Sequence, residues 1–159
     1  MNILFICLGN ICRSPLAEEV FRQQVEQQGL EAQFPLIDSA GMIDYHEGEL
    51  PDSRMRACAK DRGYRLTHHS RPMLVDDFAR FDLIVAMDSD NVNRLRRLAL
   101  DPADMDKVVM LADYLREHPE ADHIPDPYYG DRKDFDYVVD LCEDACAGLL
   151  EKITHAAKA

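Results

Sequence analysis

The sequence is short of positive charge. It has 18 Lys and Arg residues against 30 Asp and Glu residues, which gives a formal net charge of −12 at pH 7. A surface that binds nucleic acid or anionic lipid needs an excess of Lys and Arg on some face. Acidic residues instead run through almost the whole chain. We therefore expect neither nucleic acid nor a membrane among its partners.

Long apolar runs and a secretion signal are also missing. No stretch approaches the roughly 18 apolar residues that a membrane-spanning helix needs, and the N-terminus lacks the basic flank and small-residue cleavage site of a signal peptide. The five cysteines are an odd number, which disfavours a disulfide scaffold and leaves reactive or simply buried thiols as alternatives. We expect a cytoplasmic protein in a reducing compartment.

The sequence does have enough apolar character for one core. Hydrophobic residues make up 47% of the chain, and it shows no internal repeat or linker, so residues 1–159 are expected to form a single domain. Strands are predicted at 2–7, 34–39, 81–88 and 107–111, and helices at 15–28, 52–61, 75–79, 89–98 and 135–155. This alternation predicts an α/β fold, a three-layer sandwich of a four-stranded parallel sheet with helices on both faces.

The segment after the first strand reads CLGNICRS, residues 7–14, and is called the cradle loop below. Gly9 permits backbone geometries that other residues resist, and Asn10 tolerates a left-handed conformation. Pro15 suits the first position of a helix, so the helix is predicted to begin at Ser14 and to point its positive end into the loop. Loop N–H groups and helix end together form an anion cradle after strand one.

Two side chains of the cradle loop predict its chemistry. Arg13 offers a planar fork of donors that matches two oxygens of a phosphoryl group. The positive surroundings favour the thiolate form of Cys7, and the Ser14 hydroxyl can donate a further hydrogen bond to it. We predict that Cys7 attacks phosphorus while Arg13 and the loop amides hold the equatorial oxygens. The alternative, Cys7 as a buried core thiol, leaves Gly9 and Arg13 unexplained. The loop residues predicted to contact substrate are Leu8, Gly9, Asn10, Ile11, Cys12 and Ser14.

Expelling an alkoxide or phenoxide requires a proton donor, and Asp126 in the segment HIPDPYYGD is the candidate. Pro125 and Pro127 fix their own φ angles, and Pro127 biases Asp126 toward an extended conformation. Tyr128 and Tyr129 can form an aromatic wall for a flat substrate ring. In isolation Pro-Asp-Pro is usually only a turn, so the assignment depends on Cys7.

These motifs resemble the low-molecular-weight protein tyrosine phosphatases over essentially the whole chain. The resemblance implies a phosphotyrosine phosphatase that needs no cofactor or metal and forms a cysteinyl-phosphate intermediate. It also implies a phosphotyrosine protein or peptide as partner, with inorganic phosphate or similar oxyanions as product-like inhibitors. The matching stretches are CLGNICRSPLAEE, DSAG at 38–41, LPDSR at 50–54, HHSR at 68–71, FDLIVAMDSDN at 81–91 and DPYYG at 126–130.

The resemblance also implies roles for individual residues. Cys7 matches the nucleophile, Arg13 the phosphate-binding arginine, and Asp126 the general acid that later activates water. Ser14 matches the serine that stabilises the thiolate. Cys12 matches a second cysteine that can pair reversibly with the nucleophile and so spare it from irreversible oxidation. The residues that match those shaping the loop from behind are Asn10, Ser39 and His68.

Two expectations go beyond the matched motifs. Asp88 ends the third strand at the same sheet edge as the cradle loop, and our hypothesis is that it orients Arg13. The chain departs from the pattern of many family members at Met42, Ile43, Tyr45 and Pro72, which bears on the substrate and not on the chemistry. Tyr45, Tyr128 and Tyr129 are expected to form the pocket wall.

Other readings of the sequence remain as alternatives. Arsenate reductases of the same fold need two further cysteines, and the region 80–100 has none. Protein arginine phosphatases typically carry Thr where this loop has Ile11, and an apolar Ile11 favours a phenyl ring. A flavodoxin-like or receiver-type module would need hydroxyl or acidic groups after the first strand. A phosphate-binding protein without activity would lack the nucleophile or the acid.

Several further residues are predicted to be structural. Cys142 and Cys146 lie four apart without histidines at a matching spacing, so they are expected to be core thiols, as is Cys58. His118 and His123 are expected to be solvated loop histidines. The cluster Arg94, Arg96 and Arg97 is interpreted as a solvated face, with steering of a phosphorylated partner as the alternative.

Overall fold

The central sheet has four parallel strands, in the order β2-β1-β3-β4. In this computed structural model the backbone is described for residues 1–158 and the side chains for residues 1–156. The strands are β1 (Asn2–Cys7), β2 (Leu36–Gly41), β3 (Leu83–Ala86) and β4 (Val108–Met110). The predicted four-stranded parallel sheet is therefore confirmed.

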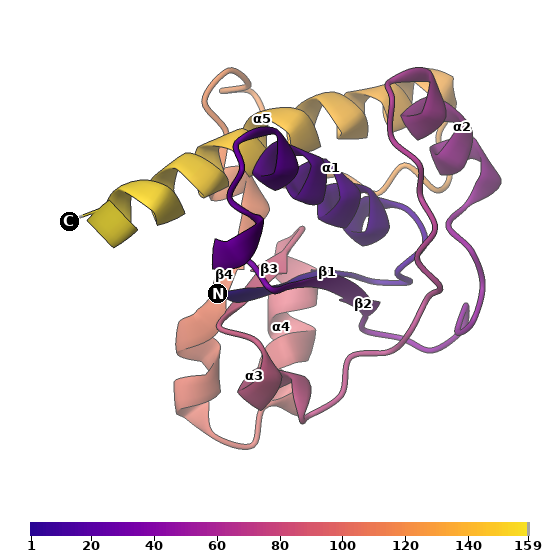
Figure 1. The fold of residues 1–159 in the computed structure, drawn as a ribbon. Coiled ribbons are helices and arrows are strands. Elements are labelled where there is room, and N and C mark those ends of the chain that lie inside the picture. The colour runs from indigo at the N-terminus through magenta and orange to yellow at the C-terminus, as the bar shows by residue number, and fades with distance from the viewer. Residues whose placement is uncertain (159) are drawn as a thin grey trace.

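Helices cover both faces of the sheet, as Figure 1 shows. On one side lie α1 (Arg13–Gln27), α2 (Ser53–Asp61) and α5 (Arg132–Lys158), and on the other α3 (Asp77–Arg80) and α4 (Ser89–Leu98). Three short 3-10 helices complete the chain: η1 (Glu31–Gln33), η2 (Pro102–Lys107) and η3 (Leu111–Tyr114). No helix within residues 1–158 is both long and apolar enough to cross a membrane.

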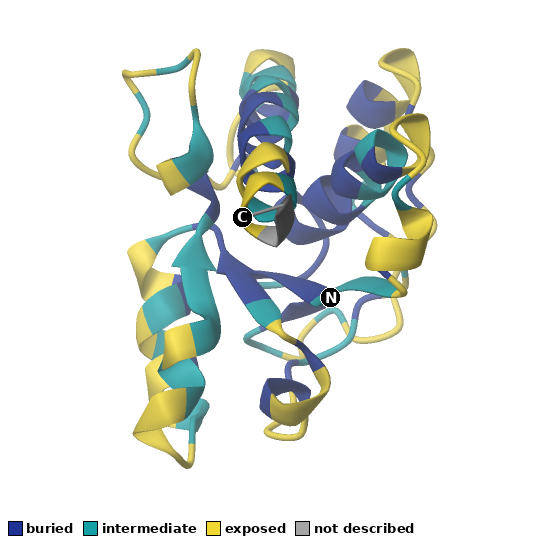
Figure 2. Cartoon of the chain, turned by 60° about the vertical axis from the view of Figure 1, so that its left-hand side comes forward, coloured by how far each residue is buried: buried dark blue, intermediate teal, exposed yellow. Residues whose placement is uncertain are grey.

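Side chains alternate across β1 because successive residues of a strand point to opposite faces. Ile3, Phe5 and Cys7 belong to the core beneath α1 and α5, whereas Leu4 and Ile6 belong to the core on the side of α3 and α4. These five side chains are at most 3% exposed. A strand buried on both faces needs a continuous apolar run, and Figure 2 shows the middle of the sheet in dark blue between its two helical layers, with teal toward the edges.

Several predicted boundaries differ from the observed ones by two or three residues, and two of the differences have identifiable reasons. The second strand begins at Leu36 and not at residue 34, because Phe34 packs edge-to-face on Phe21 at 5.3 Å instead of pairing in the sheet. The first helix begins at Arg13, two residues before Pro15. The first N–H groups of a helix have no intrahelical acceptor, so Pro15 is tolerated anywhere in that turn.

The strand order places a crevice beside the end of β1. From β1 the chain crosses to β2 on one side and then returns to β3 on the other. Parallel sheets bind ligands outside the carboxyl ends of the strands where the connections diverge in this way. The cradle loop follows β1, and Asp88 follows β3 at the same edge.

Candidate active site

The cradle loop turns its carbonyl groups outward. Four of its carbonyl oxygens accept hydrogen bonds of 2.8 to 3.0 Å from outside the loop: Cys7 from Met42, Leu8 from Ile43, Gly9 from the Ser70 hydroxyl, and Ile11 from Asp52. In a planar trans peptide, the C=O and the next N–H point in opposite directions, so the N–H groups converge on the centre of the loop. The Asn10 N–H follows this rule, since it donates to Cys7 Sγ at 3.3 Å.

Asn10 turns the loop and anchors it from behind. Its φ of 57° is left-handed, a conformation that asparagine adopts more readily than most residues. The buried amide nitrogen donates to the hydroxyls of Ser14 (2.8 Å) and Ser39 (3.0 Å), and the amide oxygen accepts from the Arg71 backbone N–H (3.0 Å). The left-handed turn is thus held by a satisfied set of buried hydrogen bonds.

Cys7 lies at the base of the cradle with its sulfur directed at hydrogen-bond donors. Its Sγ is 3.0 Å from Ser14 Oγ. Because Ser14 Oγ already accepts a hydrogen bond from Asn10, its own proton is available to the sulfur. The Ser14 hydroxyl and the Asn10 N–H therefore both point hydrogen-bond donors at the sulfur.

Arg13 joins the cradle loop to two other segments. The side chain is 3% exposed, and its Nη1 donates to Asp88 Oδ2 (2.6 Å) and to the Ile124 carbonyl (2.9 Å). Burial alone would lower the pKa of Arg13, but Cys7, Asp88 and Asp126 together raise it, so the guanidinium stays charged. With Nη1 committed to the protein, Nε and Nη2 are left to face an anion.

The Asp126 carboxylate faces the cradle from the opposite loop. Its Oδ1 accepts from the Tyr128 N–H at 3.1 Å, and its Oδ2 is 3.7 Å from Arg13 Nη2. Ile124, two residues earlier, is fully buried, and its N–H donates to the Met87 carbonyl at 2.9 Å. The segment IPDPYYGD, residues 124–131, is called the acid loop below. It is tied to the residue after β3 and to Arg13.

A cavity of about 330 Å³ lies over the sulfur, bounded by the cradle loop, Asp126 and aromatic side chains. The exposed rings of Tyr45 and Tyr129 stand at its mouth with Tyr128. Sequence reasoning missed His46, which also lines the cavity and packs edge-to-face on Tyr45 at 4.8 Å. No periodicity or motif marks this histidine in the sequence.

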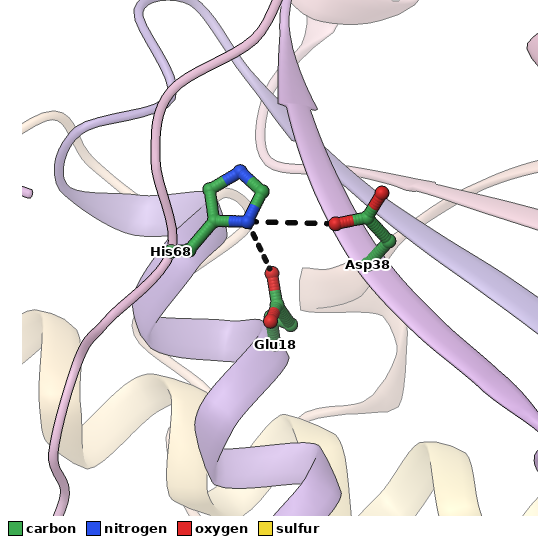
Figure 3. Close-up of side chains that lie close together, drawn as sticks. All are labelled: Glu18, Asp38 and His68. Carbon is green, nitrogen blue, oxygen red and sulfur yellow. Dashed lines mark ion pairs between the residues drawn. The ribbon is translucent and has the colours of Figure 1, made fainter. Parts of the chain in front are cut away.

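Three side chains behind the cradle converge in Figure 3. His68 Nδ1 lies 3.4 Å from Glu18 Oε1 and 3.5 Å from Asp38 Oδ1. Its Nε2 is 2.8 Å from Asn10 Oδ1, and because that oxygen also accepts the Arg71 backbone N–H, Nε2 must be a donor. Nδ1 faces two carboxylates, to which a ring nitrogen can donate only through an N–H.

His68, Glu18 and Asp38 thus form one cluster behind the cradle loop. Within the described side chains, these three are the group close enough to share a metal ion. Glu18 also accepts from the Ser39 hydroxyl at 2.7 Å, which links the cluster to Asn10. Glu18 and Asp38 were not among the predicted site residues.

The other four cysteines are also buried. All five cysteines are free. Burial, followed by the charge of Cys7, raises the pKa of Cys12 far above its usual range. Burial also raises the pKa of Cys58 to about 11 and that of Cys142 to about 12. These three cysteines are therefore neutral thiols at neutral pH.

The structure brings most of the predicted site together at one sheet edge. Asp88 contacts Arg13 as expected, and Asn10, Ser39 and His68 form one hydrogen-bonded network. The expectation of a solvated His118 is wrong, because its Nδ1 lies 2.9 Å from a carboxylate oxygen of buried Asp144. The polar residues next to His118 in the sequence gave no sign that its partner would be Asp144, 26 residues later.

Comparisons with known proteins agree with this geometry. The family model described as "Low molecular weight phosphotyrosine protein phosphatase" matches residues 2–159. A putative low molecular weight protein-tyrosine-phosphatase of Synechocystis is 48% identical over 155 residues, which is 96% of each chain. The corresponding protein of Streptomyces coelicolor is 43% identical over 153 residues, 96% of this chain and 93% of its own. A protein tyrosine phosphatase of Entamoeba histolytica, solved with Hepes in its active site, superposes with a TM-score of 0.94 at 41% identity over 99% of both chains.

Proposed function

The chain belongs to the low molecular weight phosphotyrosine protein phosphatase family, and we propose that it hydrolyses phosphotyrosine in proteins or peptides through a cysteinyl-phosphate intermediate on Cys7. The observation that carries this proposal is the position of the Cys7 sulfur, beneath converging loop N–H groups and beside a buried, charged Arg13. In this proposal residues 1–159 act as one catalytic domain in the cytoplasm, a compartment that suits five free thiols.

In the first displacement the Cys7 thiolate attacks phosphorus. The S–P bond forms as the P–O bond to the tyrosine oxygen breaks, and the Asp126 carboxyl gives its proton to the departing oxygen. Arg13 supports this step with Nε and Nη2, because its Nη1 is bound to Asp88 and Ile124. The guanidinium plane and the loop amides then match the three equatorial oxygens of the transferred phosphoryl group.

In the second displacement water attacks the cysteinyl phosphate. Asp126, now a carboxylate, takes a proton from the water as the new P–O bond forms and the S–P bond breaks. The Ser14 hydroxyl, 3.0 Å from the sulfur, stabilises the thiolate as it leaves. Asn10, Ser39 and His68 act behind the loop by holding Ser14 and the left-handed turn in place.

The cavity favours an aryl phosphate over an alkyl phosphate. Ile11 lines its side wall, and Tyr45, Tyr128 and Tyr129 stand at its mouth, so a phenyl ring gains apolar and aromatic contacts that a serine side chain does not offer. The same cradle accepts inorganic phosphate and similar oxyanions, which are therefore expected to inhibit competitively. The chemistry uses the protein's own groups and requires no cofactor.

Steady-state hydrolysis of matched phosphotyrosine, phosphoserine and phosphoarginine peptides, with EDTA present, tests this proposal. Cys7→Ser should abolish turnover, whereas Cys58→Ser, the same substitution at a buried thiol away from the cavity, should leave it within about twofold of wild type. A preference for phosphoarginine would keep the mechanism and replace the substrate. Multiple turnover by pure Cys7→Ser protein would overturn the thiolate mechanism.

A further inference from the structure

A carboxylate outside the active site holds the segment that leads to the acid loop. Asp144 lies on α5 and is 8% exposed. Its oxygens accept from the backbone N–H of Arg116, at 3.2 and 3.1 Å, and from that of Glu117 at 2.9 Å. The imidazole of His118 adds a contact of 2.9 Å through Nδ1. Three consecutive residues are thus bound to one side chain.

The charge of Asp144 makes this a strong anchor. Burial by itself would raise the pKa of Asp144, but hydrogen bonds from His118 and from the Glu117 and Arg116 amides outweigh burial and hold the pKa below its usual value. The same hydrogen bond is the main cause that raises the pKa of His118. Hydrogen bonds to an ionised acceptor are roughly twice as strong as those between neutral groups.

The segment between this anchor and the acid loop has few other contacts. Residues 119, 120, 122 and 123 are exposed. Within it, the Ala121 N–H bonds locally to the His118 carbonyl, and Tyr137 of α5 donates to Glu120 at 2.7 Å on the surface. The next buried contact is Ile124, bound to Met87 and Arg13. The partly buried Ala121 also packs against the core. Otherwise residues 119–123 are held at their two ends.

The helix that carries Asp144 also packs against the helix that follows the cradle loop. Figure 1 shows α5 lying alongside α1, which begins at Arg13, and the two helices pack together. At Gly148 the helix packs directly on η3, since a Cβ there would clash with the Tyr114 carbonyl oxygen. One pair of packed helices thus carries the phosphate-binding arginine and the anchor of the segment before the acid.

We propose that Asp144 is a positioning residue for the general acid, which acts by fixing residues 116–118 against α5 so that the following segment brings Asp126 over the cradle. The inference rests on the proposed function, in which Asp126 protonates the leaving group. It assigns Asp144 no contact with substrate. Its effect should therefore be confined to the step that depends on Asp126.

The test compares Asp144→Asn with Glu143→Gln. The neighbouring Glu143 loses the same charge from the same helix, but it pairs with Arg62 and Tyr64. The kcat/KM is measured for aryl phosphates with increasingly basic leaving groups, together with inhibition by inorganic phosphate. Asp144→Asn should lower kcat/KM roughly two- to thirtyfold for the most basic leaving group, and less for the least basic. Phosphate inhibition, and every value for Glu143→Gln, should match wild type.

A double substitution separates positioning from a general structural effect. In an Asp126→Asn background, Asp144→Asn should cause little further loss, because both changes act through one group and their effects are not additive. If Asp144→Asn does not fold, His118→Gln provides a second test. It removes one donor to Asp144, whose carboxylate keeps the Arg116 and Glu117 N–H groups as partners. It should shift the leaving-group dependence in the same direction.

Each outcome bears on one of the two proposals. Equal losses for all leaving groups, or full additivity in the double variant, would overturn the positioning role of Asp144. Normal leaving-group dependence in both Asp144→Asn and His118→Gln, with wild type dependent on Asp126, would also overturn it and leave the proposed function intact. Wild-type protein without Cys7-dependent phosphotyrosine hydrolysis would overturn the proposed function itself.

Discussion

Replacing Asn10 with alanine should disconnect the cradle loop from the residues behind it. Ser39 keeps Glu18 as a partner and Ser14 keeps Cys7, so the groups left without an acceptor are the Arg71 N–H and His68 Nε2. Both are only partly buried, so each costs about 1 kcal/mol, the low end for an unsatisfied buried donor. The left-handed φ of 57° costs alanine a further 1 to 2 kcal/mol, roughly. We expect Asn10→Ala to lower the free energy of unfolding by about 3 to 4 kcal/mol.

Asn10→Gly separates the two contributions. Glycine loses the same hydrogen bonds but adopts the left-handed turn freely, and its more flexible unfolded chain costs about 0.4 to 1 kcal/mol. The two variants should therefore unfold within about 1 kcal/mol of each other in urea titrations. Both should also lose about tenfold or more in kcat/KM, since Ser14 no longer has its position fixed. Asn10→Gly with wild-type stability and activity would refute the importance of the side-chain network.

Three further predictions use other parts of the site. Asp126→Asn should reduce kcat/KM by about 10²-fold or more for the most basic leaving groups and far less for the least basic, with Asp122→Asn as a control four residues earlier in the chain. A flat leaving-group series would remove Asp126 from the acid role. Peroxide should convert Cys7 to a sulfenic acid that the Cys12 thiol attacks to form a disulfide and release water, so Cys12→Ser should recover less activity with added thiol, and equal recovery would contradict this pairing. The hydrogen bond to Asp144 raises the pKa of His118 above the 6.5 of the unfolded chain. The bond therefore stabilises the fold fully below pH 6.5, and this stability is lost as the pH rises through the pKa of His118 in the folded protein. The stability difference between wild type and His118→Gln, from urea titrations at several pH values, should shrink on going from pH 6 to more alkaline pH, roughly across the range where histidine titrates, and a constant difference would contradict the pairing.

Sequence reasoning predicted the sheet, its helical layers and the cradle loop with Cys7 and Arg13, because the sequence signals for these features are local. The run from Ile3 to Ile6 is apolar without interruption, which is what burial on both faces requires. Cys7, Asn10 and Arg13 lie within one loop of eight residues, so local backbone preferences fix how their side chains are placed. The contact between Arg13 and Asp88 needed only the rule that the carboxyl ends of parallel strands share an edge.

The missed features depend on contacts between distant parts of the chain. Asp38 reaches His68 only because the loop that carries His68 runs beside β2, and Asp144 reaches His118 only because α5 packs beside η3 and the segment after it. Gly41 is another example: a Cβ there would lie 2.9 Å from the Leu8 carbonyl oxygen, so the glycine is required by the close packing of β2 on the cradle loop. Neither propensity nor periodicity carries such information, because neighbours in space are far apart in sequence.

Arg13 explains how a chain of net charge −12 can bind an anion. Charges beyond about 8 Å are largely screened at physiological ionic strength, so the many surface carboxylates act weakly on the site. Inside the cavity the positive charge comes from the buried guanidinium of Arg13. Its two carboxylate neighbours lie at different distances from it. Asp88 holds Nη1 at 2.6 Å and orients the fork, whereas Asp126 stays 3.7 Å from Nη2. The looser contact leaves Asp126 free to exchange protons with leaving group and water while Arg13 keeps hold of the phosphoryl oxygens. The same residue thus binds the anion and, through the Ile124 carbonyl, ties the acid loop to the cradle.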